Sequence, residues 1–278
     1  MTDMPDLASF LAKACYSTED LRRIVVILRA PGGCPWDAKQ THESIKKNFI
    51  EETYEAIEGI NKHDDTLLCE ELGDVLLQVA LHTQIAQDRG VFGWDNVTDG
   101  ICRKLIERHP HVFGEAQVTG IDNVLSNWDT IKRKSKGQDR FADAMAHVPR
   151  ELPALMRAQK LEQKAAKAGF GRHDVWGALA KLEEEVRALR EAIAEDDAAH
   201  CKKELGDVLF CACNVGKFLH CDAEEALTQA SDKFLARFTF VEESVRAQGR
   251  NLRDCSDELL DKLWEQAKDR LREPHLST

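Results

Sequence analysis

The chain has 278 residues with a formal net charge of −11, and 43% of its residues are hydrophobic. This length suits one large domain or two ordinary ones, and the negative charge argues against broad binding to nucleic acid or to an anionic membrane. A phosphate ligand is not excluded, because clustered carboxylates can hold divalent cations that reverse the local field.

The first half of the chain predicts a series of helices. Only 6% of all residues are aromatic, and glycine and proline fall between long periodic segments, so we predict an all-α protein. Helices are expected at residues 19–30, 42–61, 65–89 and 95–109, with a shorter one around Trp128. These four longer helices begin beside polar residues that can cap a first turn: Thr18, Thr41 or His42, Asp64 or Asp65, and Asp95.

A polar stretch at residues 137–150 is predicted to link two modules, at residues 1–136 and 151–278. The second module is expected to begin with a helical segment at 152–170, followed by a helix around residues 181–195. Asp196 or Asp197 should cap the next helix, and Asp222, with Glu225 three residues on, resembles the capping box of a further one.

Cysteine usage and the N-terminus indicate a cytoplasmic protein. The nine cysteines form no C-x-x-C pair, and this odd number favours reduced thiols over disulfides or a zinc site. The first residues lack the basic and apolar regions of a signal peptide. No apolar run reaches the roughly 18 residues that a membrane-spanning helix needs.

The two halves are related by an internal duplication with an offset of 133 residues. The sequence ELGDV occurs at 71–75 and again at 204–208, and Glu52 of the first half falls on Glu185 of the second. With small shifts, KLIERH at 104–109 resembles KFLARF at 233–238, and WDTIKR at 128–133 resembles WEQAKD at 264–269. Such a long period indicates two related modules and not a short-repeat solenoid.

Two pairs of carboxylates predict a metal site in the first half. Glu52 and Glu55 are three residues apart, as are Glu71 and Asp74, so each pair shares one face of a helix. A short connection favours an antiparallel helix pair that brings these faces together. In a chain with 49 acidic residues a single such pair is usually a solvated face, but the combination and its repetition favour a metal site.

The ligand types favour Mg²⁺, with Mn²⁺ possible, because both cations prefer oxygen ligands. A di-iron bundle would need histidines in an E-x-x-H pattern, and zinc would need nitrogen or sulfur ligands; neither occurs at these positions. Such a cation would clamp phosphate groups and activate a water. Gly73 and Gly206 are expected to let a backbone or a ligand approach closely. His109 and His111 are expected to be loop or helix-end residues.

Together with GGCPWD at 32–37 and RHPHVF at 108–113, the pattern EExxE followed by ExxD resembles the MazG family of all-α nucleoside triphosphate pyrophosphohydrolases. The similarity runs from about Leu21 to Leu271. It implies two tandem four-helix-bundle-like modules that form homodimers. It also implies Mg²⁺-dependent hydrolysis of nucleoside triphosphates, ribo and deoxy, to the monophosphate and pyrophosphate, in a house-cleaning or regulatory role.

The resemblance also assigns roles to individual residues. The catalytic and metal-binding residues of the first half would be Glu52, Glu55, Glu71 and Asp74. The metal-binding residues of the second half would be Glu185, Glu204 and Asp207. The nucleotide-binding residues would be Lys104, Arg108, Trp128, Lys181, Lys233, Arg237 and Trp264. A solvated face remains an alternative for the basic pair on 104–108, as does a core position for the tryptophan at 128.

The second half departs from the family pattern at one position. Ala188 stands where the second glutamate of EExxE belongs, and Glu191, one turn further on, could replace it only if the helix shifted. We therefore expect catalysis in the first half, and a second half that binds nucleotide while hydrolysing it poorly. Two alternatives stay open: a nucleotide-sensing helical module with little or no turnover, and a structural interaction protein, which would leave the repeated carboxylates unexplained.

Overall fold

The computed structural model describes residues 10–135, 137, 140–171 and 174–270, and within these residues the regular elements are all helices. Its contacts divide the chain into two units, Met1–Lys132 and Arg133–Thr278. The helices that begin in the first unit are α2 (Thr18–Arg29), α3 (Pro35–Lys39), α4 (His42–Asn61), α5 (Asp65–Asp88), α6 (Trp94–Arg108), α7 (Pro110–Phe113) and α8 (Ile121–Ser135).

The second unit holds α9 (Phe141–Ala146), α10 (Ala154–Lys167), α11 (Val175–Ala194), α12 (Ala198–Phe218), α13 (Ala223–Ala247), a 3-10 turn η1 (Leu252–Asp254) and α14 (Asp257–Arg270). The stretch predicted as a linker therefore contains a short helix, α9, which packs on α10 and buries Ala144. The module boundaries given from the sequence stay a prediction. In the described parts of the chain, no helix is both long enough and apolar enough to cross a membrane.

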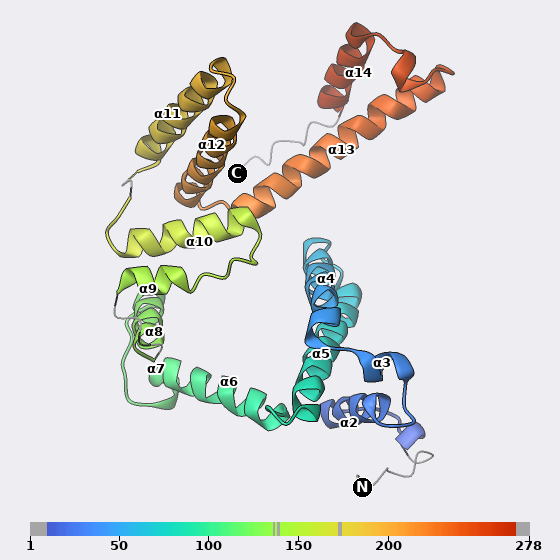
Figure 1. Ribbon diagram of the computed structural model, residues 1–278, viewed down its shortest axis with the longest axis vertical. Coiled ribbons are helices and arrows are strands. Elements are labelled where there is room, and N and C mark those ends of the chain that lie inside the picture. Colours follow the sequence, from blue (N-terminus) through green and yellow to red (C-terminus); the bar gives the residue numbers. More distant parts are fainter. Residues whose placement is uncertain (1–9, 136, 138–139, 172–173, 271–278) are drawn as a thin grey trace. The chain divides into compact units, whose positions relative to one another are not determined.

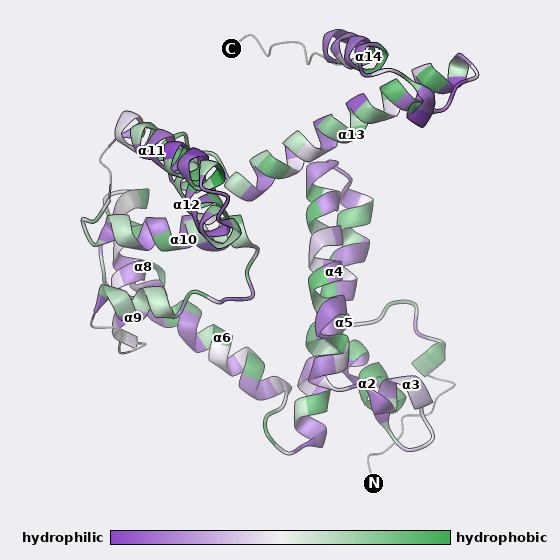
Figure 2. Ribbon diagram, turned by 45° about the horizontal axis from the view of Figure 1, so that its top comes forward, coloured by the Kyte–Doolittle hydropathy of each residue, from purple (hydrophilic) through white to green (hydrophobic). Residues whose placement is uncertain are grey.

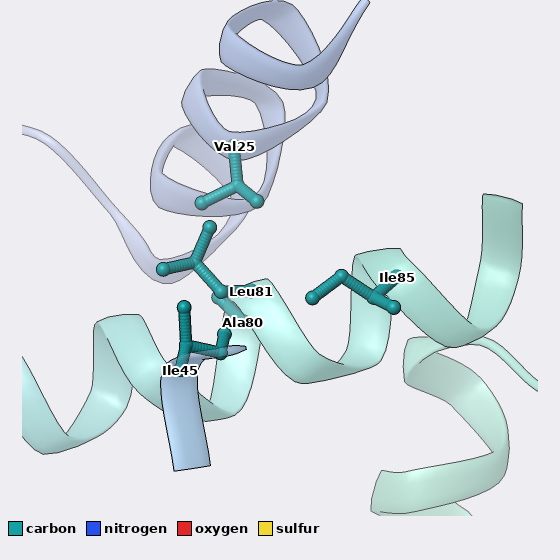
Figure 3. Packing of buried hydrophobic residues seen from close by; sticks show 5 residues of the cluster. All are labelled: Val25, Ile45, Ala80, Leu81 and Ile85. Atoms are coloured by element: carbon teal, nitrogen blue, oxygen red, sulfur yellow. The ribbon is translucent and has the colours of Figure 1, made fainter. Parts of the chain in front are cut away.

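The helices α4 and α5 form an antiparallel hairpin, and α2 packs across α5 (Figure 1). Figure 3 shows the core at this junction, where Val25 of α2 and Ile45 of α4 face a row of side chains on α5. That row consists of Ala80, Leu81 and Ile85. Burial of the valine, leucine and isoleucine side chains, at roughly 1.5–3 kcal/mol each, holds the hairpin against α2.

Capping residues fix where these helices begin. Thr41 caps α4 and Asp64 caps α5, both within the predicted choices. The cap of α2 is Ser17 and not Thr18, because Ser17 forms a reciprocal capping box with Asp20. The carboxylate of Asp20 accepts hydrogen bonds from Lys13 and Ser17, which hold its pKa well below the usual range.

The helices α4 and α5 approach each other closely where Gly59 lies against Leu68. A Cβ at this position would lie 2.9 Å from the backbone nitrogen of Leu68, so only glycine fits without a backbone shift. At Gly73 and Gly206 no backbone of the described chain comes close, since a Cβ at either position would meet no atom within 4 Å; approach by a ligand there stays a prediction.

In the second unit, α11 and α12 form the matching hairpin, and α10 packs on α12. The turn that joins the pair repeats the first one: His63 and Asp196, which are 133 residues apart, have φ angles of 53° and 54°. Beyond this hairpin, α13 packs against α14 around Val241, Val245 and Leu263.

Both hairpins leave apolar side chains exposed at equivalent positions. Ile60 and Leu72 in the first hairpin are each 54% exposed, and their counterparts Ile193 and Leu205 are 62% and 49% exposed. Figure 2 shows that hydrophobic residues also recur along α13, where Phe234 and Leu235 are exposed.

Candidate functional site

Three carboxylates of the first hairpin gather in one cluster. Glu52 and Glu55 extend from α4 and Glu71 from α5, and one oxygen of each lies within 4.8 Å of the others. Glu71 is only 8% exposed. Asp74, one turn after Glu71 on α5, is not a member of this compact group. We name Glu52, Glu55 and Glu71 the first carboxylate cluster.

The first carboxylate cluster lacks a neutralising partner among the described side chains around it. Burial raises the pKa of Glu52, and so do the neighbouring charges of Asp74 and Glu55. The pKa of Glu71 is also raised, again by burial first and then by Glu55. The second carboxylate oxygen of Glu71 is buried and has no hydrogen-bond partner. A group of carboxylates that repel one another around the buried Glu71 fits a divalent cation with oxygen ligands.

Gln78 belongs to this site, although the sequence reasoning did not single it out. It is buried on α5, and its amide nitrogen donates a 3.4 Å hydrogen bond to a carboxylate oxygen of Glu52. The signal available in the sequence was its place one turn after Asp74, on the face that carries Glu71. Outer residues of this kind orient a metal ligand.

The second hairpin also gathers carboxylates, but lysines lie on them. One oxygen each of Glu185, Glu204 and Asp207 lies within 4.8 Å of the others. We name these three the second carboxylate cluster. The ammonium group of Lys181 lies 2.6 Å from Glu185, and that of Lys203 hydrogen-bonds to Glu204 and lies 3.3 Å from Asp207.

These ion pairs reverse the electrostatics found in the first cluster. The hydrogen bond from Lys203 lowers the pKa of Glu204 despite its burial. The pKa of Lys203 is raised by Glu204 and Asp207, and the pKa of Lys181 is raised by Glu184 and Glu185. Much of the negative charge of the second cluster is therefore offset by the chain's own lysines.

An arginine lies over a tryptophan in each unit. The guanidinium of Arg108 on α6 is 5.0 Å from the ring centre of Trp128 on α8, and that of Arg237 on α13 is 6.0 Å from Trp264 on α14. In both arginines the Nε atom is buried without a hydrogen-bond partner. Each arrangement is a cation–π contact whose guanidinium keeps unused donors.

The other predicted nucleotide-binding residues lie apart from these contacts. Lys104 and Lys233 are exposed, on α6 and α13 respectively. Between described residues, no hydrogen bond, ion pair or ring contact joins Lys104, Arg108 or Trp128 to the first carboxylate cluster. The sequence predicted these residue types but not the pairing of arginine with tryptophan.

A pair of histidines lies at the end of the first hairpin away from its turn, and the sequence did not predict it. His42 and His82 lie with their Nδ1 atoms 2.8 Å apart and their rings stacked at 5.2 Å. Burial lowers the pKa of His82, and the charge of His42 lowers it further. The two residues are 40 positions apart on separate helices, so no local spacing in the sequence indicates the pair.

Comparison with known proteins supplies the family. A family model described as the MazG nucleotide pyrophosphohydrolase domain matches residues 40–113 and again 177–241. The chain is 42% identical over 250 residues to the nucleoside triphosphate pyrophosphohydrolase/pyrophosphatase MazG of Thermotoga maritima. This match covers 90% of this chain and 95% of that protein. The chain belongs to the MazG family.

Two further relatives are similar over nearly the same length of the chain. The nucleoside triphosphate pyrophosphohydrolase of Escherichia coli (strain K12) is 38% identical over 253 residues, with 89% of this chain and 95% of that protein covered. The uncharacterized protein YabN of Bacillus subtilis is 46% identical over 249 residues. The match covers 89% of this chain and 51% of YabN, so the chain spans about half of that relative.

The two MazG segments contain both carboxylate clusters and all the predicted basic residues. Trp128 and Trp264 lie outside them. The family predicted from EExxE and ExxD is therefore confirmed, and so is the all-helical class in the described residues. The roles of the individual residues stay predictions.

Proposed function

We propose that this chain hydrolyses nucleoside triphosphates, ribo and deoxy, to the nucleoside monophosphate and pyrophosphate, with Mg²⁺ or Mn²⁺ as cofactor. The observation that carries the proposal is the first carboxylate cluster, in which Glu71 holds a buried carboxylate oxygen without a partner. Membership in the MazG family and the printed activity of the Thermotoga and Escherichia relatives support the same reaction.

In this proposal Glu52, Glu55 and Glu71 would hold the cation, and Asp74 on the next turn of α5 would be a further ligand. A bound cation of this kind neutralises charge on phosphate oxygens and lowers the pKa of a water for in-line attack. Gln78 keeps the carboxylate of Glu52 oriented through its amide donor. Burial of Glu71 keeps its charge poorly hydrated and so strengthens its attraction for a cation.

We further propose that Arg108 binds the phosphate chain and that Trp128 stacks on the base or closes the pocket. Arginine is suited to this role because its planar fork forms paired hydrogen bonds with phosphate oxygens. The tryptophan ring holds the guanidinium by a cation–π contact and so limits its orientations. Lys104, one turn before Arg108, adds another positive charge to the same face of α6.

A homodimer completes the proposal. Each hairpin provides two helices and exposes apolar side chains at matching positions, such as Leu72 and Leu205. Packing two hairpins from separate copies would bury these residues and build a four-helix bundle. The nine free cysteines fit a cytoplasmic protein, where thiols stay reduced.

The test is to measure pyrophosphate release from a panel of ribo- and deoxynucleoside triphosphates with Mg²⁺, Mn²⁺ or chelator. We expect metal-dependent release that Glu71→Gln lowers by at least about 100-fold, because an interaction of several kcal/mol is lost. The matched change in the second cluster, Glu204→Gln, should leave most of the activity. Tight nucleotide binding without turnover in either metal would favour a sensing module instead.

A further inference from the structure

The two carboxylate clusters differ in charge at the positions that the duplication relates. In the first module these seven positions are Asn48, Glu51, Glu52, Glu55, Glu70, Glu71 and Asp74, and in the second they are Lys181, Glu184, Glu185, Ala188, Lys203, Glu204 and Asp207. At these positions the first module therefore has six carboxylates, whereas the second has four carboxylates and two lysines. The difference concerns the very side chains that would compete with a cation.

The lysines make direct contact with all three members of the second carboxylate cluster. Lys203 hydrogen-bonds to Glu204 and lies 3.3 Å from Asp207, so its ammonium group bridges two of the three carboxylates. Lys181 lies 2.6 Å from Glu185 and also donates to Glu184 at 2.8 Å. The oxygen of Glu204 that accepts from Lys203 also lies 3.3 Å from the Nε2 atom of His200.

We propose that the ammonium groups of Lys181 and Lys203 take the place of the divalent cation in the second module, so that each chain binds the cation in its first module alone. An ammonium group is a compact point charge that satisfies carboxylate oxygens by hydrogen bonding. A divalent cation entering the second carboxylate cluster would have to expel Lys203 or lie beside its positive charge. It would also lack the carboxylate that Ala188 has removed. The inference rests on the proposed function only for the first module.

The experiment is a titration of the full-length protein with Mn²⁺ alone. Binding is measured by calorimetry and by the loss of the electron paramagnetic resonance signal of free Mn²⁺. In the otherwise unchanged chain, Glu71→Gln should remove all tight binding. Lys203→Glu restores the residue type found at Glu70 and should create a new class of sites that persists when combined with Glu71→Gln. Lys202→Glu, on the neighbouring exposed lysine, adds the same charge and should create none.

A second variant, Lys203→Met, removes the ammonium without adding a ligand. It should raise the affinity of the second carboxylate cluster for Mn²⁺ by at least about tenfold, because one opposing charge is removed. Helix content measured by circular dichroism checks that each variant is folded. The inference is overturned if the Glu71→Gln chain still binds Mn²⁺ tightly and Glu204→Gln removes that binding, or if neither change at Lys203 adds sites.

Failure of the proposed function would look different. It would appear as Mn²⁺ bound at the first carboxylate cluster with no pyrophosphate released from any triphosphate, and the cation-binding pattern of the Lys203 variants would still support the inference. The two questions therefore have separate readouts.

Discussion

Arg108 combines two properties at the scale of a single residue, a buried and unpartnered Nε atom and a cation–π contact with Trp128. We predict that Arg108→Ala raises KM about 10-fold or more with a smaller effect on kcat, because charge-assisted hydrogen bonds to phosphate contribute about 1.5–3 kcal/mol. Steady-state kinetics would measure the split. Arg103→Ala on the same helix is the control, since Arg103 is exposed and pairs only with Asp99 among the described residues.

His82 provides a prediction for the pH dependence of stability. Burial and His42 lower its pKa in the folded protein, whereas an unfolded histidine has a pKa of about 6.5. At His82 the unfolded chain therefore binds more protons in the range below about 6.5, and the contribution of this residue to the free energy of unfolding falls as the pH falls through that range.

Urea unfolding at several pH values between 8 and 5 tests this. We expect His82→Gln to show a weaker loss of stability on acidification than the unchanged chain. His63→Asn, at an exposed turn position whose positive φ asparagine tolerates, should keep the original slope. Equal slopes for all three proteins would contradict the role given to His82.

The helical hairpin is the element that positions the candidate site, and Gly59 sets how closely its two helices approach. A Cβ at Gly59 would lie 3.0 Å from the Cα atom of Leu68, so the backbone of α5 must move. We predict that Gly59→Ala lowers the free energy of unfolding by about 1–2 kcal/mol, because overpacking outweighs the gain in helix propensity.

The control for this change is Gly100→Ala on α6, where a Cβ would have no atom within 4 Å. That variant should gain up to about 1 kcal/mol from helix propensity. Urea denaturation followed by circular dichroism measures both. A stabilised Gly59→Ala protein would show that the hairpin can open at this point without loss.

The elements were predictable where local chemistry decides them. The polar residues Thr41 and Asp64 mark helix starts in the sequence, and the structure uses both as caps. The 133-residue offset correctly related the two hairpins down to the turn residues His63 and Asp196. The start of α2 was misplaced by one residue, because Ser17 and Thr18 are chemically alike and only the reciprocal bond with Asp20 separates them.

The candidate site was predictable in part, for a physical reason. Spacing along a helix indicates which carboxylates share a face, and the grouping of Glu52, Glu55 and Glu71 follows from that. It does not indicate which neutralising groups reach them. The contact of Lys203 with Glu204 and Asp207, and that of Gln78 with Glu52, depend on side-chain conformation and on the partner helix.

At the scale of the whole molecule, the exposed apolar residues of the hairpins predict self-association. We expect the chain to have twice its own mass in solution, since burying several such side chains at roughly 1.5–3 kcal/mol each would stabilise a dimer. Leu72→Lys should shift the mass toward that of one chain, as measured by light scattering during size-exclusion chromatography. Lys46→Ala, an exposed polar position on α4, should leave the mass unchanged.

The lysines on the second carboxylate cluster have a consequence for how the two modules depend on their surroundings. Lys203 is part of the same helix as Glu204, so its local concentration is set by the geometry of the chain and cannot be diluted. The cation proposed at Glu71 would instead have to be supplied by the solvent, and a chelator could withdraw it. When that ion is scarce, the carboxylates of the first cluster would therefore repel one another more strongly, whereas the second cluster would keep its lysines and stay unchanged.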